Sequence, residues 1–183
     1  MDTIKTLRYK LIDNFLNTNE VELLKNYCLI KHRINDNSFD TRLNINGDTY
    51  FYGDPLMESL LLQRLTLIEK SCNLELLATY ADWKMYSKFS SKDRGIENES
   101  CEITVTIMLG SDKTLWPFST DNFYIELNPG DALIYLGREF EHWREEFQGD
   151  WYAQCSLHYV DKNGPYKHLS KDGRFLYGTQ KNI

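Results

Sequence analysis

The sequence has no paired cysteines, no long apolar run and no excess of basic residues. Its four cysteines lie far apart and none forms a C-x-x-C pair, which disfavours a zinc ribbon or a thiol redox motif. No signal peptide opens the chain and no apolar run approaches the length of a membrane span. A net charge of −6 disfavours general nucleic-acid binding, which needs a basic face. We therefore expect a soluble cytoplasmic protein with cysteines that are small buried residues.

The composition indicates one folded domain. The chain has 183 residues, of which 42% are hydrophobic and 14% aromatic, enough to build a core and too many for a disordered segment. This length corresponds to a single domain, and no internal repeat, linker or low-complexity tract divides it.

Two amphipathic helices are predicted in the first 73 residues. Asn17 and Glu20 have the spacing of a reciprocal N-terminal cap, followed by apolar residues at helical intervals. Asp54-Pro55 starts the second helix with an acidic cap and a proline at the first helical position, and Asn73 ends it. The polar stretch 31–53 between them predicts a loop. We expect both helices to cover one face of a sheet.

Beyond residue 74 the hydrophobic pattern changes towards a period of two, which predicts strands. Several short strands with turn residues between them are typical of an antiparallel sandwich or barrel. In the strand CEITVTIML, Cys101, Ile103 and Val105 point to one face, and the pattern leaves open which face is the core. The expected strands are an edge strand at Leu11–Leu16, one or two strands within 76–89, and strands at 101–109, Phe123–Leu127, Asp131–Leu136 and Trp151–Val160.

One histidine stands between the last two predicted strands. His142 is followed by Trp143 and Arg144. The mouth of a β-barrel is a rigid place in which neighbouring groups can orient an imidazole for a metal. A histidine beside a tryptophan is equally an ordinary packed residue, and both interpretations stay open at this point.

Several segments resemble 2-oxoglutarate and Fe(II)-dependent oxygenases, in a prolyl 4-hydroxylase-like subgroup of marine bacteria and their phages. The resemblance covers roughly residues 50 to 165 and implies a mainly β fold, the double-stranded β-helix or jelly-roll, with N-terminal helices on one side. It divides the single domain into helical support (1–73), a barrel (74–165) and a C-terminal tail on the surface (166–183). The matching segments are YGDPLMESLL, ATYADWKMY, DR, CEITVTIMLG, WPF, PGDALIYLG, HWRE and LHYVDKNGP.

The resemblance also implies an iron site. Family members hold Fe(II) with a His-x-Asp pair and a distal histidine, a facial triad that leaves positions for 2-oxoglutarate and O₂. On this chain the distal histidine is His142 and the carboxylate is Asp93. The family's first histidine falls on Ser91, so the implied triad is incomplete.

The family grips 2-oxoglutarate with a basic residue on the strand after the distal histidine, and no Lys or Arg occurs between Glu145 and Val160. Arg144 is a substitute, because its guanidinium can bind a carboxylate with two hydrogen bonds. The alternative is a surface Arg144 paired with Glu145 or Glu146. The remaining co-substrate candidates are Tyr86, Lys84, Gln154 and His158, the last two on one face of their predicted strand.

Two functions from different classes follow. One is a 2-oxoglutarate/Fe(II)-dependent dioxygenase that acts on a peptide side chain or a small molecule through an altered metal site. The other is a catalytically inactive oxygenase fold that serves as a binding or partner-regulating module. A third interpretation, a structural jelly-roll with no site, requires His142 to be simply packed.

Overall fold

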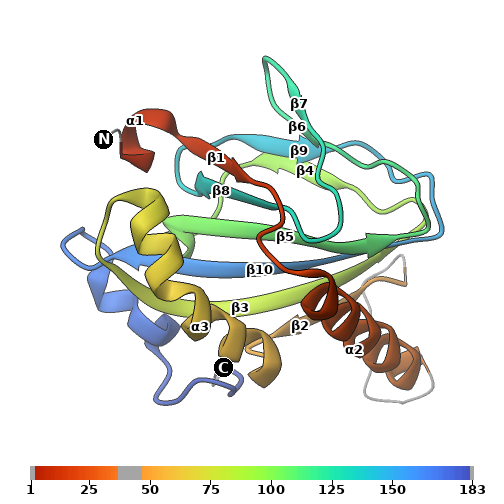
Figure 1. Ribbon diagram of the computed structural model, residues 1–183, viewed down its shortest axis with the longest axis horizontal. Coiled ribbons are helices and arrows are strands. Elements are labelled where there is room, and N and C mark those ends of the chain that lie inside the picture. Colours follow the sequence, from red (N-terminus) through yellow and green to blue (C-terminus); the bar gives the residue numbers. More distant parts are fainter. Residues whose placement is uncertain (1–2, 37–46, 182–183) are drawn as a thin grey trace.

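The main sheet has six strands and every neighbouring pair in it is antiparallel. The computed structural model describes residues 3–36 and 47–181, and Figure 1 shows the sheet running across the molecule. Its spatial order is β1 (Tyr9–Ile12), β8 (Ala132–Leu136), β5 (Ile103–Ser111), β10 (Trp151–Asp161), β3 (Leu76–Ser87) and β2 (Thr49–Tyr52).

A second, smaller sheet lies across one face of the main sheet (Figure 1). Its strands are also antiparallel, in the order β4 (Lys92–Gly95), β9 (His142–Arg144), β6 (Phe118–Ser119) and β7 (Tyr124–Ile125). The main sheet and this smaller sheet therefore enclose an interior between them, as in a jelly-roll.

Helices cover the opposite face of the main sheet. α3 (Pro55–Cys72) packs on β3 and β10, and α2 (Thr18–Asp36) packs on β5 and β3. The remaining helices are α1 (Ile4–Leu7) and the 3₁₀ helices η1 (Glu99–Cys101) and η2 (Lys167–Gly173). No helix within residues 3–36 and 47–181 is long and apolar enough to cross a membrane.

The predicted starts of both long helices and the predicted end of α3 are confirmed. Asn17 and Glu20 exchange hydrogen bonds between side chain and backbone, at 2.9 and 3.1 Å. The Asp54 carboxylate accepts from the backbone N–H groups of Leu56 and Met57, and the chain leaves α3 at Asn73 in a left-handed conformation. These local signals fix where both long helices lie along the chain.

The side chains of β5 alternate between two layers of the interior. Ile103, Val105 and Ile107 point towards the helices and join the larger apolar core. Thr106 and Met108 point towards the smaller sheet, where Met108 belongs to a second, aromatic cluster. Alternation along one strand thus places an apolar layer behind the sheet and a polar and aromatic layer between the sheets.

Several predicted boundaries shift in the structure. The edge strand predicted at Leu11–Leu16 is β1 at Tyr9–Ile12, and the strand predicted at Phe123–Leu127 shrinks to β7. The loop predicted over 31–53 is wrong at both ends, because α2 continues to Asp36 and β2 begins at Thr49; residues 37–46 lie outside the described part of the chain. The segment 1–73 therefore adds two edge strands as well as helices.

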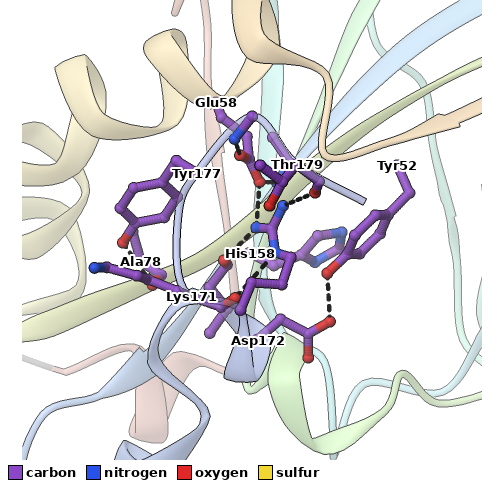
Figure 2. A network of polar contacts seen from close by, with 12 residues as sticks. Tyr52, Glu58, Ala78, His158, Lys171, Asp172, Tyr177 and Thr179 are labelled. Carbon is purple, nitrogen blue, oxygen red and sulfur yellow. Dashed lines mark hydrogen bonds and ion pairs between the residues drawn. The ribbon is translucent and has the colours of Figure 1, made fainter. Parts of the chain in front are cut away.

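The C-terminal segment is anchored to the core, although the sequence predicted a tail on the surface. Arg174 is buried and pairs with Glu58 of α3 at 2.5 Å. Its guanidinium also donates to the carbonyls of Thr79, Lys171 and Thr179. Figure 2 shows Glu58, Lys171 and Thr179 of this network close together, with dashed lines for its hydrogen bonds and ion pairs. We call the Arg174–Glu58 pair with these carbonyls the tail anchor.

Candidate functional site

A cavity of about 220 Å³ lies between the two sheets. It is smaller than the ~300–1,000 Å³ typical of pockets for drug-sized ligands, which limits it to a small molecule. Its wall is predominantly polar and carries both signs of charge. The charged and imidazole side chains that line it are Asp82, Lys84, Lys92, Glu97, His142, Arg144 and His158.

Two long strands supply much of this wall through their alternation. On β3, Asp82, Lys84 and Tyr86 lie two residues apart and all line the cavity. On β10, Gln154, Ser156 and His158 do the same, and Gln154 and His158 share a face as their spacing predicted. The intervening residues of both strands face the helices, so the apolar core holds the polar wall in place.

His142 is held in one orientation at the edge of the cavity. Its side chain is fully buried, and its Nδ1 lies 2.9 Å from the carbonyl oxygen of Phe140. Because a carbonyl can only accept, Nδ1 carries a proton, and Nε2 is left without a hydrogen-bond partner among the described residues. Nε2 lies 3.3 Å from Oε1 of Glu97. This oriented imidazole directs its second nitrogen at a carboxylate and into the cavity.

Glu97 is the centre of a cluster of polar groups. Its Oε1 accepts hydrogen bonds from Lys92 at 3.1 Å and from the hydroxyl of Tyr135 at 3.2 Å, and it faces His142. Burial raises the pKa of Glu97, but the imidazole of His142 and the charges of Lys92 and His158 together outweigh it and hold this pKa well below its usual range. Glu97 is therefore ionised at neutral pH.

Asp93 and Ser91 lie apart from this cluster. Both are exposed and neither lines the cavity. An irregularity in the β4–β9 ladder places Lys92 opposite Arg144 and Gly95 opposite His142. The structure thus does not bring Asp93 to His142, and the carboxylate that faces this histidine is Glu97.

The sequence did contain a signal for Glu97. It stands two residues after Gly95, which is the spacing of a His-x-Asp pair. The resemblance placed the carboxylate on Asp93 instead, in the matching segment DR. Only the pairing between β4 and β9 shows which residue lies opposite His142.

Arg144 is buried in an aromatic box, so the surface interpretation of this residue is wrong. Its guanidinium carbon lies 4.0, 4.4 and 4.7 Å from the ring centroids of Phe118, Trp116 and Tyr152. Nη2 donates to the hydroxyl of Tyr152 at 3.3 Å. Nε and Nη1 have no hydrogen-bond partner among the described residues. A buried cation with two unused donors is the arrangement that an anionic ligand completes.

His158 is fully engaged by its neighbours. Nε2 lies 3.2 Å from the Asp82 carboxylate, and Nδ1 lies 3.1 Å from the hydroxyl of Thr104. That hydroxyl donates its proton to the carbonyl of Cys101, so it accepts from Nδ1 and both ring nitrogens carry protons. Burial lowers the pKa of His158, but Cys101 and Asp82 outweigh it and raise this pKa to about 10. His158 is an imidazolium and has no free nitrogen for a metal.

Lys84 and Tyr86 stand next to each other on the cavity wall. The ammonium of Lys84 lies 5.1 Å from the ring centroid of Tyr50. Tyr86 and nearby acidic groups raise the pKa of Lys84, so it stays charged. Burial raises the pKa of Tyr86, although Lys84 and Arg144 act against it, so its hydroxyl remains a donor. Both residues can therefore donate to an anion.

The balance of charge in the cavity is positive. The cations are Lys84, Lys92, Arg144 and His158, and the anions are Asp82 and Glu97. The wall thus carries two more positive than negative charges, which matches a ligand with two negative charges.

The donor set does not fit the iron of a facial triad. Such a triad needs two imidazoles and one carboxylate on one face. Within residues 3–36 and 47–181, no three His, Cys, Asp or Glu side chains come together in a way that could hold a metal ion. The cavity offers His142 and Glu97, while both nitrogens of His158 are used and Gly95 has no side chain.

Comparison with known proteins shows the fold. No family model and no curated protein matches the sequence. Among solved structures, a viral collagen prolyl hydroxylase from Paramecium Bursaria Chlorella virus-1, in its 2-oxoglutarate complex, matches with a TM-score of 0.64 and 12% identity, over 83% of this chain and 94% of that one. The main sheet, smaller sheet and helices therefore form the double-stranded β-helix fold of 2-oxoglutarate and Fe(II) oxygenases, as the sequence predicted.

Two further solved structures have a similar fold. A prolyl hydroxylase from Trichoplax adhaerens, solved with a fragment of a hypoxia-inducible-factor peptide, matches with a TM-score of 0.64 and 16% identity, over 91% of this chain and 89% of that one. HygX from Streptomyces hygroscopicus, with nickel and 2-oxoglutarate bound, matches with a TM-score of 0.63 and 11% identity, over 87% and 85%. At these identities the likeness concerns the fold, and the site must be argued from its own residues.

Proposed function

We propose that this chain is a 2-oxoglutarate oxygenase-like protein that binds 2-oxoglutarate, or a dicarboxylate of the same class, in the cavity between its sheets. The observation that carries this proposal is the buried Arg144 with two unused donors. An unpaired buried charge is costly, so its retention points to a ligand that completes it.

The rest of the wall suits a dicarboxylate. Arg144, with Lys84 and Tyr86 on the facing strand, would hold one carboxylate, and the charged groups around Glu97 and His142 line the same cavity. The excess of two positive charges would be neutralised by a dianion. Two of the solved neighbours bear 2-oxoglutarate, which supports the choice of ligand.

Calorimetric titration tests this proposal. We expect saturable binding of 2-oxoglutarate and weaker binding of a monocarboxylate of similar size. Arg144→Met should weaken binding at least about 100-fold, because hydrogen bonds to charged groups contribute about 1.5–3 kcal/mol each.

The matched control is Arg94→Met. Arg94 is exposed and pairs with Glu141 and Asp121 outside the cavity, so its removal should leave affinity unchanged. Absence of binding by the native chain, or equal losses in the two variants, would contradict the proposal.

A second candidate is the iron-dependent hydroxylation of a peptide side chain or a small molecule. The observation that favours it is the free Nε2 of His142, directed at an ionised carboxylate. Its test is conversion of 2-oxoglutarate to succinate with Fe(II), abolished by His142→Ala. The metal role of Asp93 is not part of this candidate, because its side chain lies outside the cavity.

Four free, buried cysteines are consistent with action in the cytoplasm.

A further inference from the structure

We propose that Lys92 is the built-in cation of this cavity, so that the dicarboxylate binds without any metal ion. This inference rests on the proposed function and concerns the end of the cavity at Glu97. It follows from three observations on β4 and the loop behind it.

The first observation is that the carboxylate oxygen facing His142 is already occupied. Oε1 of Glu97 accepts from the ammonium of Lys92 at 3.1 Å and from the hydroxyl of Tyr135 at 3.2 Å. A carboxylate oxygen offers about two lone pairs, and these two donors use them. A metal ion shared between this oxygen and His142 would have to displace one of the donors.

The second observation is the residue opposite His142. Gly95 is its partner in the β4–β9 ladder, and it stands two residues before Glu97. A Cβ added to Gly95 would meet no atom within 4 Å. There is thus room for a third ligand at this position, and the sequence supplies none. Ser91, on which the family resemblance put the first histidine, is exposed and outside the cavity.

The third observation is charge. The cavity already carries two more positive than negative charges, and Lys92 is one of its four cations. A divalent cation would raise this excess and would be repelled by the ammonium of Lys92. A dicarboxylate is attracted by the same field. The arrangement therefore favours the organic dianion and disfavours the metal.

The experiment compares ligand and metal binding in the same protein. We would titrate 2-oxoglutarate into the native chain with EDTA and, separately, with Co(II). We expect affinities that agree within about twofold. Lys92→Met should weaken binding in EDTA by about tenfold or more, the contribution of one charged hydrogen bond. The control Lys88→Met removes an exposed lysine that does not line the cavity and should change nothing.

Co(II) binding is measured by equilibrium dialysis of the native chain, Gly95→His, and the double variant Lys92→Met with Gly95→His. We expect no saturable binding by the native chain and saturable binding by the double variant. The affinity for Co(II) should rise at least about 10- to 100-fold, which is the loss that mutation of residues supporting the ligands of a metal site typically causes. Ser91→His, the control, should behave as the native chain.

The outcomes separate the two proposals. The role of Lys92 is overturned if the native protein binds 2-oxoglutarate only with Co(II). It is also overturned if the native protein binds Co(II) tightly and His142→Ala does not. Neither result contradicts the dicarboxylate site itself. Native protein that binds 2-oxoglutarate under neither condition overturns the proposed function. In that case Co(II) binding still decides whether Lys92 has replaced a metal. The titrations of the native protein with EDTA and with Co(II) do not depend on the folding of any variant.

Discussion

Two buried arginines, in different parts of the same domain, are surrounded in opposite ways. Arg174 of the tail anchor has a partner for every nitrogen: Glu58 and three backbone carbonyls (Figure 2). Arg144 makes one hydrogen bond, to Tyr152, and leaves Nε and Nη1 without a partner among the described residues. The first arginine is complete within the chain, and the second is not.

The same contrast holds for the polar groups around them. Among the described residues, seven buried side-chain nitrogen and oxygen atoms lack a hydrogen-bond partner, and five of these belong to residues that line the cavity. They are Asp82 Oδ1, His142 Nε2, Arg144 Nε, Arg144 Nη1 and Gln154 Oε1. Buried polar groups in folded proteins are normally paired, so such a concentration marks a place prepared for a ligand. The paired groups of the tail anchor stabilise the fold, whereas the unpaired groups of the cavity are available to bind a ligand.

The largest effect is expected at the tail anchor. Arg174→Ala should lower the free energy of unfolding by about 3–5 kcal/mol, because it leaves the Glu58 carboxylate buried and without its counter-charge. Urea unfolding measures this loss. The double variant Glu58→Gln with Arg174→Met, which removes both charges, should be milder. A loss below about 1 kcal/mol for Arg174→Ala would mean that the anchor does not hold the C-terminal segment.

Arg144→Met should leave stability nearly unchanged and weaken ligand binding, the reverse of the effect expected for Arg174→Ala. Its stability should stay within about 1 kcal/mol of the native chain, because the substitution removes a buried cation that has unused donors. Its affinity for 2-oxoglutarate should fall at least about 100-fold, or about 2.7 kcal/mol. Urea unfolding and calorimetry on the same sample give both values. A large loss of stability together with unchanged affinity would erase the contrast between the two arginines.

The helices and strands around this site could be predicted from the sequence better than the positions of its charged side chains. Capping at Asn17 and Asp54 and the alternation along the strands depend on neighbours in the chain, so the helices and long strands could be foreseen. The pairing of Gly95 with His142 depends on an irregular ladder between strands 47 residues apart in sequence, from 95 to 142. Because of this pairing, the side chain of Asp93 does not face His142.

Two other features could be known only from packing. The surface interpretation of Arg144 fails because Trp116 and Phe118, from the segment that enters β6, enclose it. Burial of Arg174 within the charged C-terminal segment depends on Glu58, more than a hundred residues earlier. Neither contact leaves a local pattern. A charged residue that the sequence places at the surface by composition can therefore be interior when its partner is distant.

The buried His158 of the cavity wall should make the stability of the fold depend on pH. The folded-state pKa of His158 is raised to about 10 from 6.5, so its stabilising contribution is complete below about pH 6.5 and is lost as the pH rises towards 10. The native chain should lose more than about 1.4 kcal/mol over this window relative to His158→Gln, one pKa unit being worth 1.36 kcal/mol. Urea unfolding at a series of pH values measures the difference. Parallel curves for the two proteins would show that His158 is not an imidazolium in the fold.

The smallest effect is expected from a carboxylate that belongs to neither cluster. Asp93 is exposed, so Asp93→Ala should change stability by no more than about 0.5 kcal/mol and leave 2-oxoglutarate binding intact. Glu97→Gln, four residues later, should weaken binding, because it removes the charge that positions Lys92 and faces His142. Calorimetry on the two variants compares them directly. If Asp93→Ala weakened binding and Glu97→Gln did not, β4 would have to present its other face to the cavity. Lys92 would then point outward, and the cavity would lose the cation that the metal-free binding of a dicarboxylate requires.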